Sequence, residues 1–491
     1  MSLDHEESMI DRISVGADEG KDLNLSNEEK ELQKLMASKQ QMMMDQSKSY
    51  LEELFKENST IPVKLRNVQV TNSQYFRDSF LQTQLSPLLR GNVMSLADFL
   101  NSLEQVHTSF MKHDILEQSM IGLHQLPKKM WNNKSPLTID MVPVFNVVPQ
   151  KRFFTKTGTN IGNGEGDGYI QFRLKNIFGG AETLVFDAVT GTKTPSSYLL
   201  NYSQPVFNRA DYLWDTSAFI NTRKLEWIQS SVQTKGIVTR INTRYDSNLN
   251  LDVAWENSWR ALSNHGSRSL EVLTQSKDTF KSSVTMGASY DSRDNRIGPT
   301  RGNLARLGVE YSGLFGFNNV KFTKFQWEGQ SALGLGQNHS LIFSNKAGLL
   351  LNGDKSKTNI LDRFHIGGPN DVRSFSLNGL GPKDQNSSVG GDCFFNGGIS
   401  LLSHIPKTPK DTNFKIINYI NFGKLASINS SNTTKDIVKL FSTGYSLSAG
   451  FGILYNHPMA RFELNFGLPI FAHANDQVRK GIQYGVGVSF L

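Results

Sequence analysis

The sequence predicts a transmembrane antiparallel β-barrel that follows a small α/β domain. Three observations lead to this prediction. From about residue 151 to the last residue, apolar and polar side chains alternate with the period of a β-strand. No run of about 20 apolar residues, the length that a transmembrane helix needs, is free of charges. Turn residues recur about every 20 positions, which fits a membrane strand of roughly 9–11 residues and its loop.

The composition agrees with this fold class and excludes others. The 491 residues include 31 Phe and 41 Gly, and Cys393 is the only cysteine. A disordered chain would have few aromatic residues, and a disulfide scaffold needs several cysteines. Although the net charge is +7, no run of Lys and Arg is interleaved with aromatic residues. We therefore expect no nucleic acid among the partners.

Residues 1–58 are expected to form an acidic tail that is disordered or partly helical. They contain 14 Asp and Glu but only 7 Lys and Arg. Met1–Ile10 has neither the basic and apolar regions of a secretory signal nor the arginines of a transit peptide. We therefore expect a protein that stays on the cytosolic side of any import pathway, or that is imported through internal signals.

Residues 59–150 are expected to form a small domain of order β-α-α-β-β. Ser95 is a plausible helix N-cap, with Asp98 three residues later as its acidic partner. The exposed edge of such a sheet could pair with an extended peptide. The predicted elements are the strand Pro62–Val70, the helices Tyr75–Leu89 and Ser95–His113, and the strands Met120–Leu126 and Leu137–Val148.

The alternation after residue 151 leaves two folds open. In the strand near the C-terminus, Phe462, Leu464 and Phe466 fall on one face, and polar residues that include Glu463 and Asn465 fall on the other. A soluble sandwich and a membrane barrel both show this pattern. The length of about 340 residues, the turn spacing and the aromatic residues near strand ends favour a barrel of roughly 16 or 17 strands, and an even number is usual.

Two loops interrupt the regular pattern. Asp291–Gly302 is a charged hairpin, which is either a solvated turn or a fixed network of charges at the barrel rim. From about 352 to 391 no strand is expected, and long loops of this kind are usually functional or disordered. Its glycines at 367, 368, 379 and 381 allow tight reversals. Arg373, between apolar residues, could pair with a carboxylate of the lumen and hold the loop inside the barrel.

No catalytic or metal-binding pattern is present in the sequence. There is no Gly-x-Ser-x-Gly, no His-Glu-x-x-His and no calcium-loop motif, and the ten histidines are scattered. We therefore expect a protein that is not an enzyme and that has no catalytic residues, bound metal or cofactor.

The loop and the C-terminus carry a family resemblance. The tetrapeptide Val372-Arg373-Ser374-Phe375, with Gly367-Gly368-Pro369 before it and Gly379-Leu380-Gly381-Pro382 after it, resembles the loop motif of the bacterial-surface-antigen (BamA-like) superfamily of outer-membrane insertases. Ser374 stands where the family usually has Gly. Matching text at 157–160, 389–392 and 457–466 extends the resemblance over about residues 60 to 491. The greatest similarity is to the core barrel subunit of the mitochondrial sorting and assembly machinery (SAM complex).

The resemblance implies a fold and a function. The α/β unit would be one POTRA domain in the intermembrane space, and residues 151–491 would form a 16-stranded barrel in the mitochondrial outer membrane. The barrel would insert β-barrel precursors such as porin-like proteins, with accessory sorting-and-assembly subunits on the cytosolic face and outer-membrane lipid around it. Its alternatives are a passive channel, a polypeptide-translocating pore of the same architecture, a barrel enzyme and a soluble all-β protein.

The mechanism implied by the family is a lateral gate between the first and last strands. Precursors of the class carry a C-terminal signal of spaced polar, Gly and hydrophobic residues, and the last strand, about 481–491, fits it at Gln483, Gly485, Val488 and Phe490. On this pattern Phe490 falls on the apolar face of that strand, and Gly485 with Gly487 would weaken it. The first strand would supply the edge that a precursor pairs with, through Phe153, Phe154, Thr155, Lys156, Thr157, Gly158, Thr159 and Asn160.

Overall fold

The chain divides into two compact units. One comprises residues 1–69, 87–105 and 122–144, and the other comprises residues 70–86, 106–121 and 145–491. None of the described helices is long and apolar enough to cross a membrane. The computed structural model describes residues 27–91, 93–126, 138–162, 165–244, 247–314, 320–336, 339–352, 358–408, 412–428, 441–442, 444–457, 460–487 and 490.

The N-terminal elements follow the predicted order with two differences. The strand expected over Pro62–Val70 is divided in two, because the side chain of Asn67 accepts the N–H of Val68 at 2.8 Å. A strand of three residues, too short to show a period, lies between the helices. The elements are α2 (Asn27–Glu57), β1 (Pro62–Leu65), β2 (Gln69–Val70), η2 (Ser73–Tyr75), α3 (Asp78–Leu89), β3 (Val93–Ser95), α4 (Leu96–Lys112), β4 (Leu116–Gln125) and β5 (Ile139–Pro149).

These strands form a mixed five-stranded sheet. β1 pairs antiparallel with β3 and parallel with β5, and β5 also pairs with β2 and β4. The predicted cap of α4 is present, since the N–H of Asp98 donates to Ser95 Oγ at 3.2 Å and that hydroxyl donates to the Asp98 carboxylate at 2.8 Å. Phenyl rings of Phe76, Phe80 and Phe110 pack together, and Phe110 also contacts Phe145 of β5.

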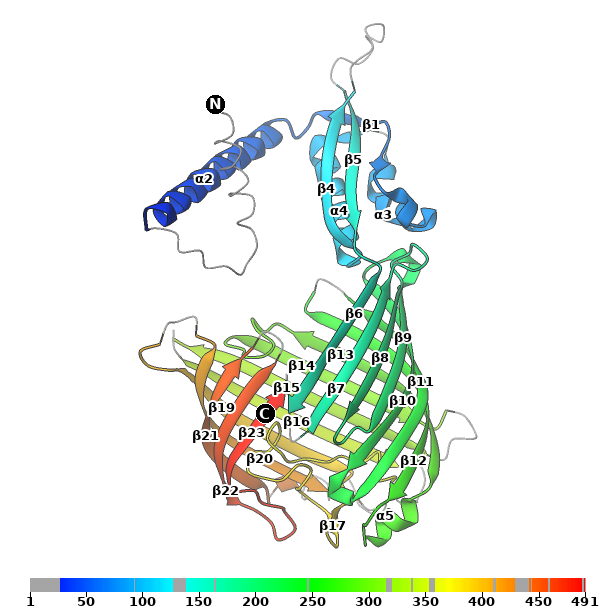
Figure 1. Cartoon of the computed structure of the whole chain (residues 1–491), viewed down its shortest axis with the longest axis vertical. Helices are drawn as coiled ribbons and strands as arrows, with labels where there is room; N and C mark the ends of the chain where they lie inside the picture. The colour runs from blue at the N-terminus through cyan, green and yellow to red at the C-terminus, as the bar shows by residue number, and fades with distance from the viewer. Residues whose placement is uncertain are drawn as a thin grey trace, which may run out of the picture. The chain divides into compact units, whose positions relative to one another are not determined.

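The rest of the chain forms one antiparallel sheet of 16 strands, which confirms the predicted barrel (Figure 1). Each strand pairs with its neighbours in the chain, and β16 pairs with β19 across the long loop. The strands are β6 (Phe153–Gly162), β7 (Glu165–Lys175), β8 (Thr183–Gly191), β9 (Ser196–Pro205), β10 (Tyr212–Leu225), β11 (Ser230–Thr243), β12 (Leu249–Asn264), β13 (Asp278–Asp291), β14 (Gly302–Ser312), β15 (Phe322–Leu335), β16 (His339–Asn352), β19 (Cys393–His404), β20 (Phe414–Ala426), β21 (Ser446–Asn456), β22 (Arg461–Phe471) and β23 (Gly481–Gly487). The turns hold η3 (Val206–Asn208), η4 (Glu226–Ile228) and α5 (Leu270–Gln275).

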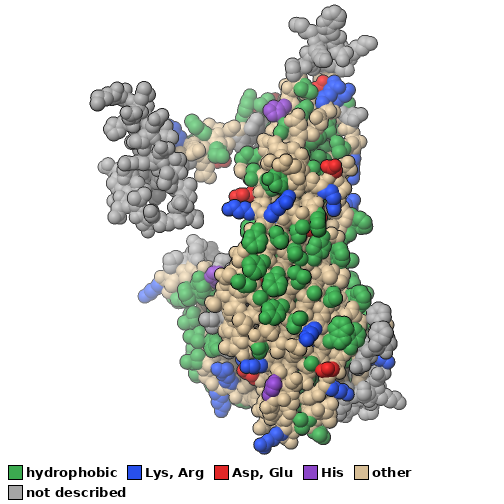
Figure 2. All heavy atoms as spheres, turned by 45° about the vertical axis from the view of Figure 1, so that its right-hand side comes forward, with side chains coloured by type: hydrophobic (Ala, Val, Ile, Leu, Met, Phe, Trp, Pro, Cys, Tyr) green, Lys and Arg blue, Asp and Glu red, His purple; other side chains and the backbone are tan. Residues whose placement is uncertain are grey.

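The alternation of each strand separates a lipid-facing side from a lumen-facing side. In β22, Leu464 is 55% exposed and Glu463 is only 3% exposed. Large apolar side chains gather on the outer wall of the barrel in the face that Figure 2 shows. A soluble sandwich would bury these side chains, so their exposure distinguishes the membrane barrel from its alternative.

The segment from 358 to 391 folds inside the barrel around an apolar core of its own. Phe364, Ile366, Val372 and Phe375 of this segment are buried against Leu425 and other apolar residues of the wall. The expectation of no strand was wrong in one detail, because β17 (Lys383–Asp384) and β18 (Ser387–Ser388) form a small hairpin. Two residues per strand are too few to show a period of two in the sequence.

Candidate functional site

The side chain of Arg373 is fully buried and bound to a carboxylate of the barrel wall. Its Nε and Nη2 donate to Glu463 of β22 at 3.1 and 2.9 Å, and its Nη1 donates to the side-chain oxygen of Asn421 in β20 at 2.9 Å. The side chains of both partners are 0% exposed. Nη2 also donates to the other carboxylate oxygen at 3.2 Å, and a buried guanidinium that binds both oxygens of a carboxylate fixes the orientation of both groups. The loop is therefore pinned to β22 as its sequence predicted.

Glu463 holds a second guanidinium as well. Arg461 forms an ion pair with the same carboxylate, and Asn465 donates to it at 2.7 Å. Two buried cations thus share one anion. The additional positive charge lies against aromatic faces: Arg373 is 4.6 Å from the ring centre of Tyr419, and Arg461 is 4.9 Å from that of Phe490. Cation–π attraction of this kind partly offsets the cost of removing a guanidinium group from water.

Ser374 adopts a backbone conformation that favours glycine. Its φ is +69°, in the left-handed region, and the residue is completely buried. The chain makes this tight reversal with a serine, at a local backbone cost. Its hydroxyl occupies the space beside Gly467 of β22, where a Cβ would overlap it.

The glycines of the motif have three different tasks. Gly367, Gly368 and Gly381 have φ values of +108°, +127° and +94°, which side chains rarely adopt. The Gly367 N–H also donates to the carboxylate of Asp371 at 2.8 Å, which closes the turn. Gly379 has an ordinary backbone but leaves room for the carbonyl of Ser376. These contacts explain why the loop needs small residues at these positions.

The loop motif also contacts the last strand. The N–H of Ser374 donates to Gln483 Oε1 at 2.8 Å, and Gln483 Nε2 donates to the carbonyl of Phe375 at 3.3 Å. Asn370 donates to the carbonyl of Val486 at 2.9 Å, and it lies with Pro369 where a Cβ on Gly485 would be. The structure thus brings together two groups of residues that the sequence had singled out separately.

Phe490 does not lie where the alternation placed it. It was expected on the lipid face with the outward residues of a strand reaching 491, but β23 ends at Gly487 and Phe490 is buried. Its ring lies over Arg461 and, at 5.7 Å, over Arg373. In the described residues the ladder with β22 ends at the pair of Gly487 and Arg461. Val488 lies outside the described residues.

The eight predicted residues of the first strand all lie in β6. They pair with β7 in register from Phe153 opposite Leu174 to Asn160 opposite Asp167. Among the described residues, the ladders of the barrel form one series from β23 to β6, so these two strands are its ends. Some Cα atoms of the two strands are nonetheless within 8 Å of each other.

Sequence reasoning missed a second set of ion pairs that holds the loop. Arg260 of β12 forms two hydrogen bonds with Asp362, at 2.7 and 3.0 Å, and Arg363 pairs with Glu271 of α5 at 2.7 Å. The neighbouring acid and base at 362 and 363, opposite an inward Arg260, were the available signal. Within the described part of the chain, no group of three or more His, Cys, Asp and Glu could hold a metal ion.

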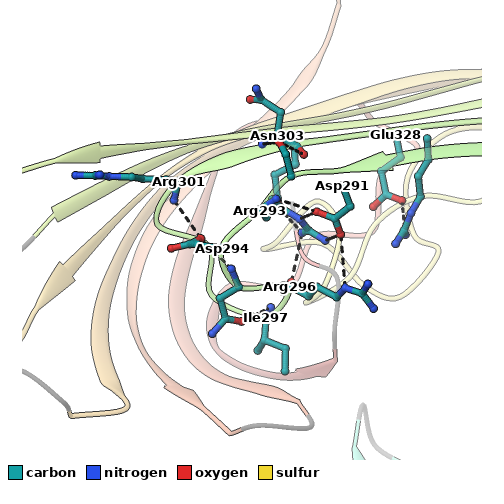
Figure 3. A network of polar contacts seen from close by, with 12 residues as sticks. Asp291, Arg293, Asp294, Arg296, Ile297, Arg301, Asn303 and Glu328 are labelled. Atoms are coloured by element: carbon teal, nitrogen blue, oxygen red, sulfur yellow. Dashed lines mark hydrogen bonds and ion pairs between the residues drawn. The ribbon is translucent and has the colours of Figure 1, made fainter. Parts of the chain in front are cut away.

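The hairpin 291–302 is a fixed network of charges, as one of its two interpretations held (Figure 3). Arg293 donates twice to the carboxylate of Asp291, each time at 2.9 Å, and Asp294 accepts the N–H groups of Thr300 and Arg301 at 2.9 and 3.2 Å. The tip, at Gly298, touches Asn456 of β21, a strand that does not neighbour β13 or β14. The turn therefore reaches across the barrel opening.

Most of the barrel matches a known protein family. Residues 176–490 match the Omp85 superfamily domain. This match covers the barrel strands from β8 to β23, the loop and its partner Glu463. The chain belongs to the Omp85 superfamily.

Two relatives within the superfamily align over nearly the whole chain. A SAM50-like protein of Schizosaccharomyces pombe is 30% identical over 454 residues, which cover 90% of this chain and 94% of the relative. The sorting assembly machinery 50 kDa subunit of Saccharomyces cerevisiae is 30% identical over 476 residues, which cover 89% and 96%. The crystal structure of BamA from Haemophilus ducreyi lacking POTRA domains 1–3 superposes with a TM-score of 0.70 at 12% identity, over 86% of this chain and 84% of that one. This similarity supports the fold of a POTRA domain and an Omp85 barrel.

Proposed function

We propose that this protein inserts β-barrel precursors into the mitochondrial outer membrane by pairing their C-terminal signal strand with β6. The observation that carries the proposal is the contact between the loop motif and the last strand, through Ser374 and Gln483 at 2.8 Å. The relatives named as sorting and assembly machinery subunits support it. A pore that only conducts solutes needs no such contact between an internal loop and an edge strand.

The physical task is to keep backbone groups paired during insertion. A precursor with a free edge would leave N–H and C=O groups bare in lipid, and each costs several kcal/mol, on the order of 2–7. An edge of the insertase can accept that strand by main-chain hydrogen bonds. The two ends of the ladder series, β6 and β23, are the natural place for such an exchange. No covalent step is needed.

The contacts of the last strand give a physical reason for the spacing of the signal. The polar side chain of Gln483 binds backbone groups of the loop, Gly485 leaves space for Asn370, and Phe490 lies over two guanidinium groups. A precursor signal with the same spacing would offer the same three groups. The loop would then hold either the chain's own strand or the incoming one.

The proposal includes an orientation and partners. The POTRA domain would lie in the intermembrane space, where precursors arrive, and the barrel domain would begin at about residue 151. Accessory sorting-and-assembly subunits would bind the cytosolic face. We assign residues 59–150 to the POTRA domain and leave 1–58 as a tail outside it.

A disulfide scan tests the strand exchange. In a chain with Cys393→Ser, single cysteines are placed at Phe153 to Asn160, and a porin-like precursor with one cysteine in its last strand is imported into mitochondria. We expect crosslinks that follow one antiparallel register. Cysteines in β10, which has a ladder on both sides, serve as the control and should give none.

The scan, together with depletion of the protein and an export assay, separates the rival functions. Crosslinks in several registers, or equal crosslinks in β10, would contradict the exchange. Normal assembly of precursors in mitochondria depleted of this protein would favour a passive channel. Export of the precursor across the membrane, in place of insertion, would favour a polypeptide-translocating pore.

A further inference from the structure

An apolar groove of about 400 Å³ lies in the outer wall of the barrel. We call it the outer groove and define it by Leu307 of β14, Trp327 of β15, Ala347 and Leu349 of β16, and Cys393 of β19. It is independent of the loop motif, which lies on the other side of the same strands.

The register of the strands puts these side chains on the lipid side. Leu349 is opposite Cys393, and Ala347 is opposite both Trp327 and Phe395. Leu350, the residue after Leu349, points inward and is buried in the core of the loop. Side chains of a strand alternate between its faces, so the groove opens toward the membrane. A hollow in this surface is bordered by lipid.

Aromatic rings build one wall of the groove. The ring of Tyr445 stands edge-on to Phe395 at 6.3 Å and to Phe422 at 5.7 Å between centroids. The Tyr445 hydroxyl donates to the carbonyl of Phe441, four residues earlier, at 2.9 Å, so this bond closes a turn within the segment before β21. These rings project from the surface of β19 and β20 and form one side of the groove.

The polar atoms around the groove already have partners. The indole N–H of Trp327 donates to Asn345 Oδ1 at 2.7 Å, and the hydroxyl of Tyr445 donates to the carbonyl of Phe441. Gln326 alternates with Trp327 and so points to the opposite face. No charged side chain is among the described residues that line the groove. Nothing in it would orient a polar or charged ligand.

We infer that the outer groove binds one acyl chain of a membrane phospholipid. The chemistry is purely apolar, the opening is continuous with the lipid-facing surface, and apolar ligands bind such sites in proportion to the area they bury. Cys393 is the first residue of its strand, so the groove lies near one end of the barrel wall. A lipid could therefore keep its headgroup at the interface while one chain fills the groove.

Photo-crosslinking tests this inference on the full chain. The protein is reconstituted in nanodiscs that contain a phosphatidylcholine with a diazirine in one acyl chain, and labelled peptides are identified by mass spectrometry. We expect residues 393–395 and 347–349 to be labelled several-fold more than the outward residues of β10. Equal labelling of both walls would overturn the inference.

Two matched variants sharpen the test. Ala347→Trp fills the groove, whereas Ala218→Trp adds the same side chain at an outward position of β10. The first should remove the excess labelling at 393–395 and the second should leave it unchanged; an unchanged excess in Ala347→Trp would contradict the site. If Ala347→Trp fails to fold, the ratio between the two walls in the unaltered protein still decides. Labelling of the isolated barrel that disappears in the assembled complex would assign the groove to a protein partner.

Discussion

The hydroxyl of Ser374 fills the space that glycine leaves at position 467. A Cβ on Gly467 would overlap Ser374 Oγ and the Tyr419 hydroxyl. Position 374 has a left-handed backbone, with φ of +69°, a conformation that favours glycine. In this chain the serine is therefore accommodated by the absence of a side chain on the facing strand.

This relationship predicts a thermodynamic coupling between the two positions. Gly467→Ala should destabilise the barrel by about 1–3 kcal/mol, the usual cost of overpacking. Ser374→Gly should stabilise it by up to about 1 kcal/mol, because the left-handed backbone is no longer strained. The double variant should recover part of the loss, and unfolding in urea measures all three. Gly308→Ala is the control, since its nearest neighbour would be 3.9 Å away; additive effects at 374 and 467 would contradict the coupling.

The barrel could be predicted from the sequence because successive side chains of a strand point to opposite faces, so that apolar and polar residues alternate between lipid and lumen. Glu463 and Leu464 were assigned to opposite faces by alternation alone, and their exposures agree. Arg373 was singled out, but Glu463 was not identified as its partner, because a contact across 90 residues leaves no periodic trace. Phe490 was misplaced for a related reason. Alternation describes a residue only while its strand continues, and β23 ends at Gly487.

Arg373 and Glu463 should differ strongly in their effect on stability. Arg373→Ala leaves Glu463 paired with Arg461 and Asn465, so we expect impaired precursor assembly with a modest loss of stability. Glu463→Gln removes the carboxylate that the two buried guanidinium groups of Arg373 and Arg461 share, and removal of one partner of a buried pair costs about 3–5 kcal/mol. Urea unfolding of the purified barrel and import of a porin-like precursor measure the two effects.

The control for this comparison is an ion pair in the same barrel that water reaches. Arg306 is 3.2 Å from Glu328, and its side chain is half exposed. Arg306→Ala should change the free energy of unfolding by less than about 1 kcal/mol and leave assembly intact. Normal precursor assembly by Arg373→Ala would show that the loop pin has no role in insertion.

His113, which follows α4, should make the protein sensitive to acid. Burial lowers the pKa of its imidazole from 6.5 to about 4, and the positive charge of Arg244 adds to this effect. The folded state therefore prefers the neutral ring. Its contribution to stability is fully present above pH 6.5 and is lost as the pH falls toward 4, by as much as about 3 kcal/mol. His113→Phe should flatten the dependence of the unfolding free energy on pH between 6.5 and 4; an unchanged slope would exclude His113 as its source.

The register of β6 identifies which of its N–H groups point away from β7 and so toward an incoming precursor strand. The N–H of Lys175 donates to the carbonyl of Arg152 at 2.7 Å, which makes these two residues a hydrogen-bonded pair. Such pairs alternate along an antiparallel ladder. Phe154, Lys156 and Gly158 therefore bond to β7, and the N–H groups of Thr155 and Thr157 point to the other edge.

A proline scan of β6 should consequently give opposite results at neighbouring positions. Thr155→Pro removes an edge donor and keeps the β6–β7 ladder, since proline is tolerated on an edge strand whose N–H is unused. We expect a folded barrel with a wild-type midpoint of unfolding that no longer forms precursor crosslinks. Lys156→Pro should instead lower the midpoint, because it removes a bond to β7. Thr155→Val keeps the donor and should behave as wild type; normal crosslinking by Thr155→Pro would mean that precursors do not pair with this edge.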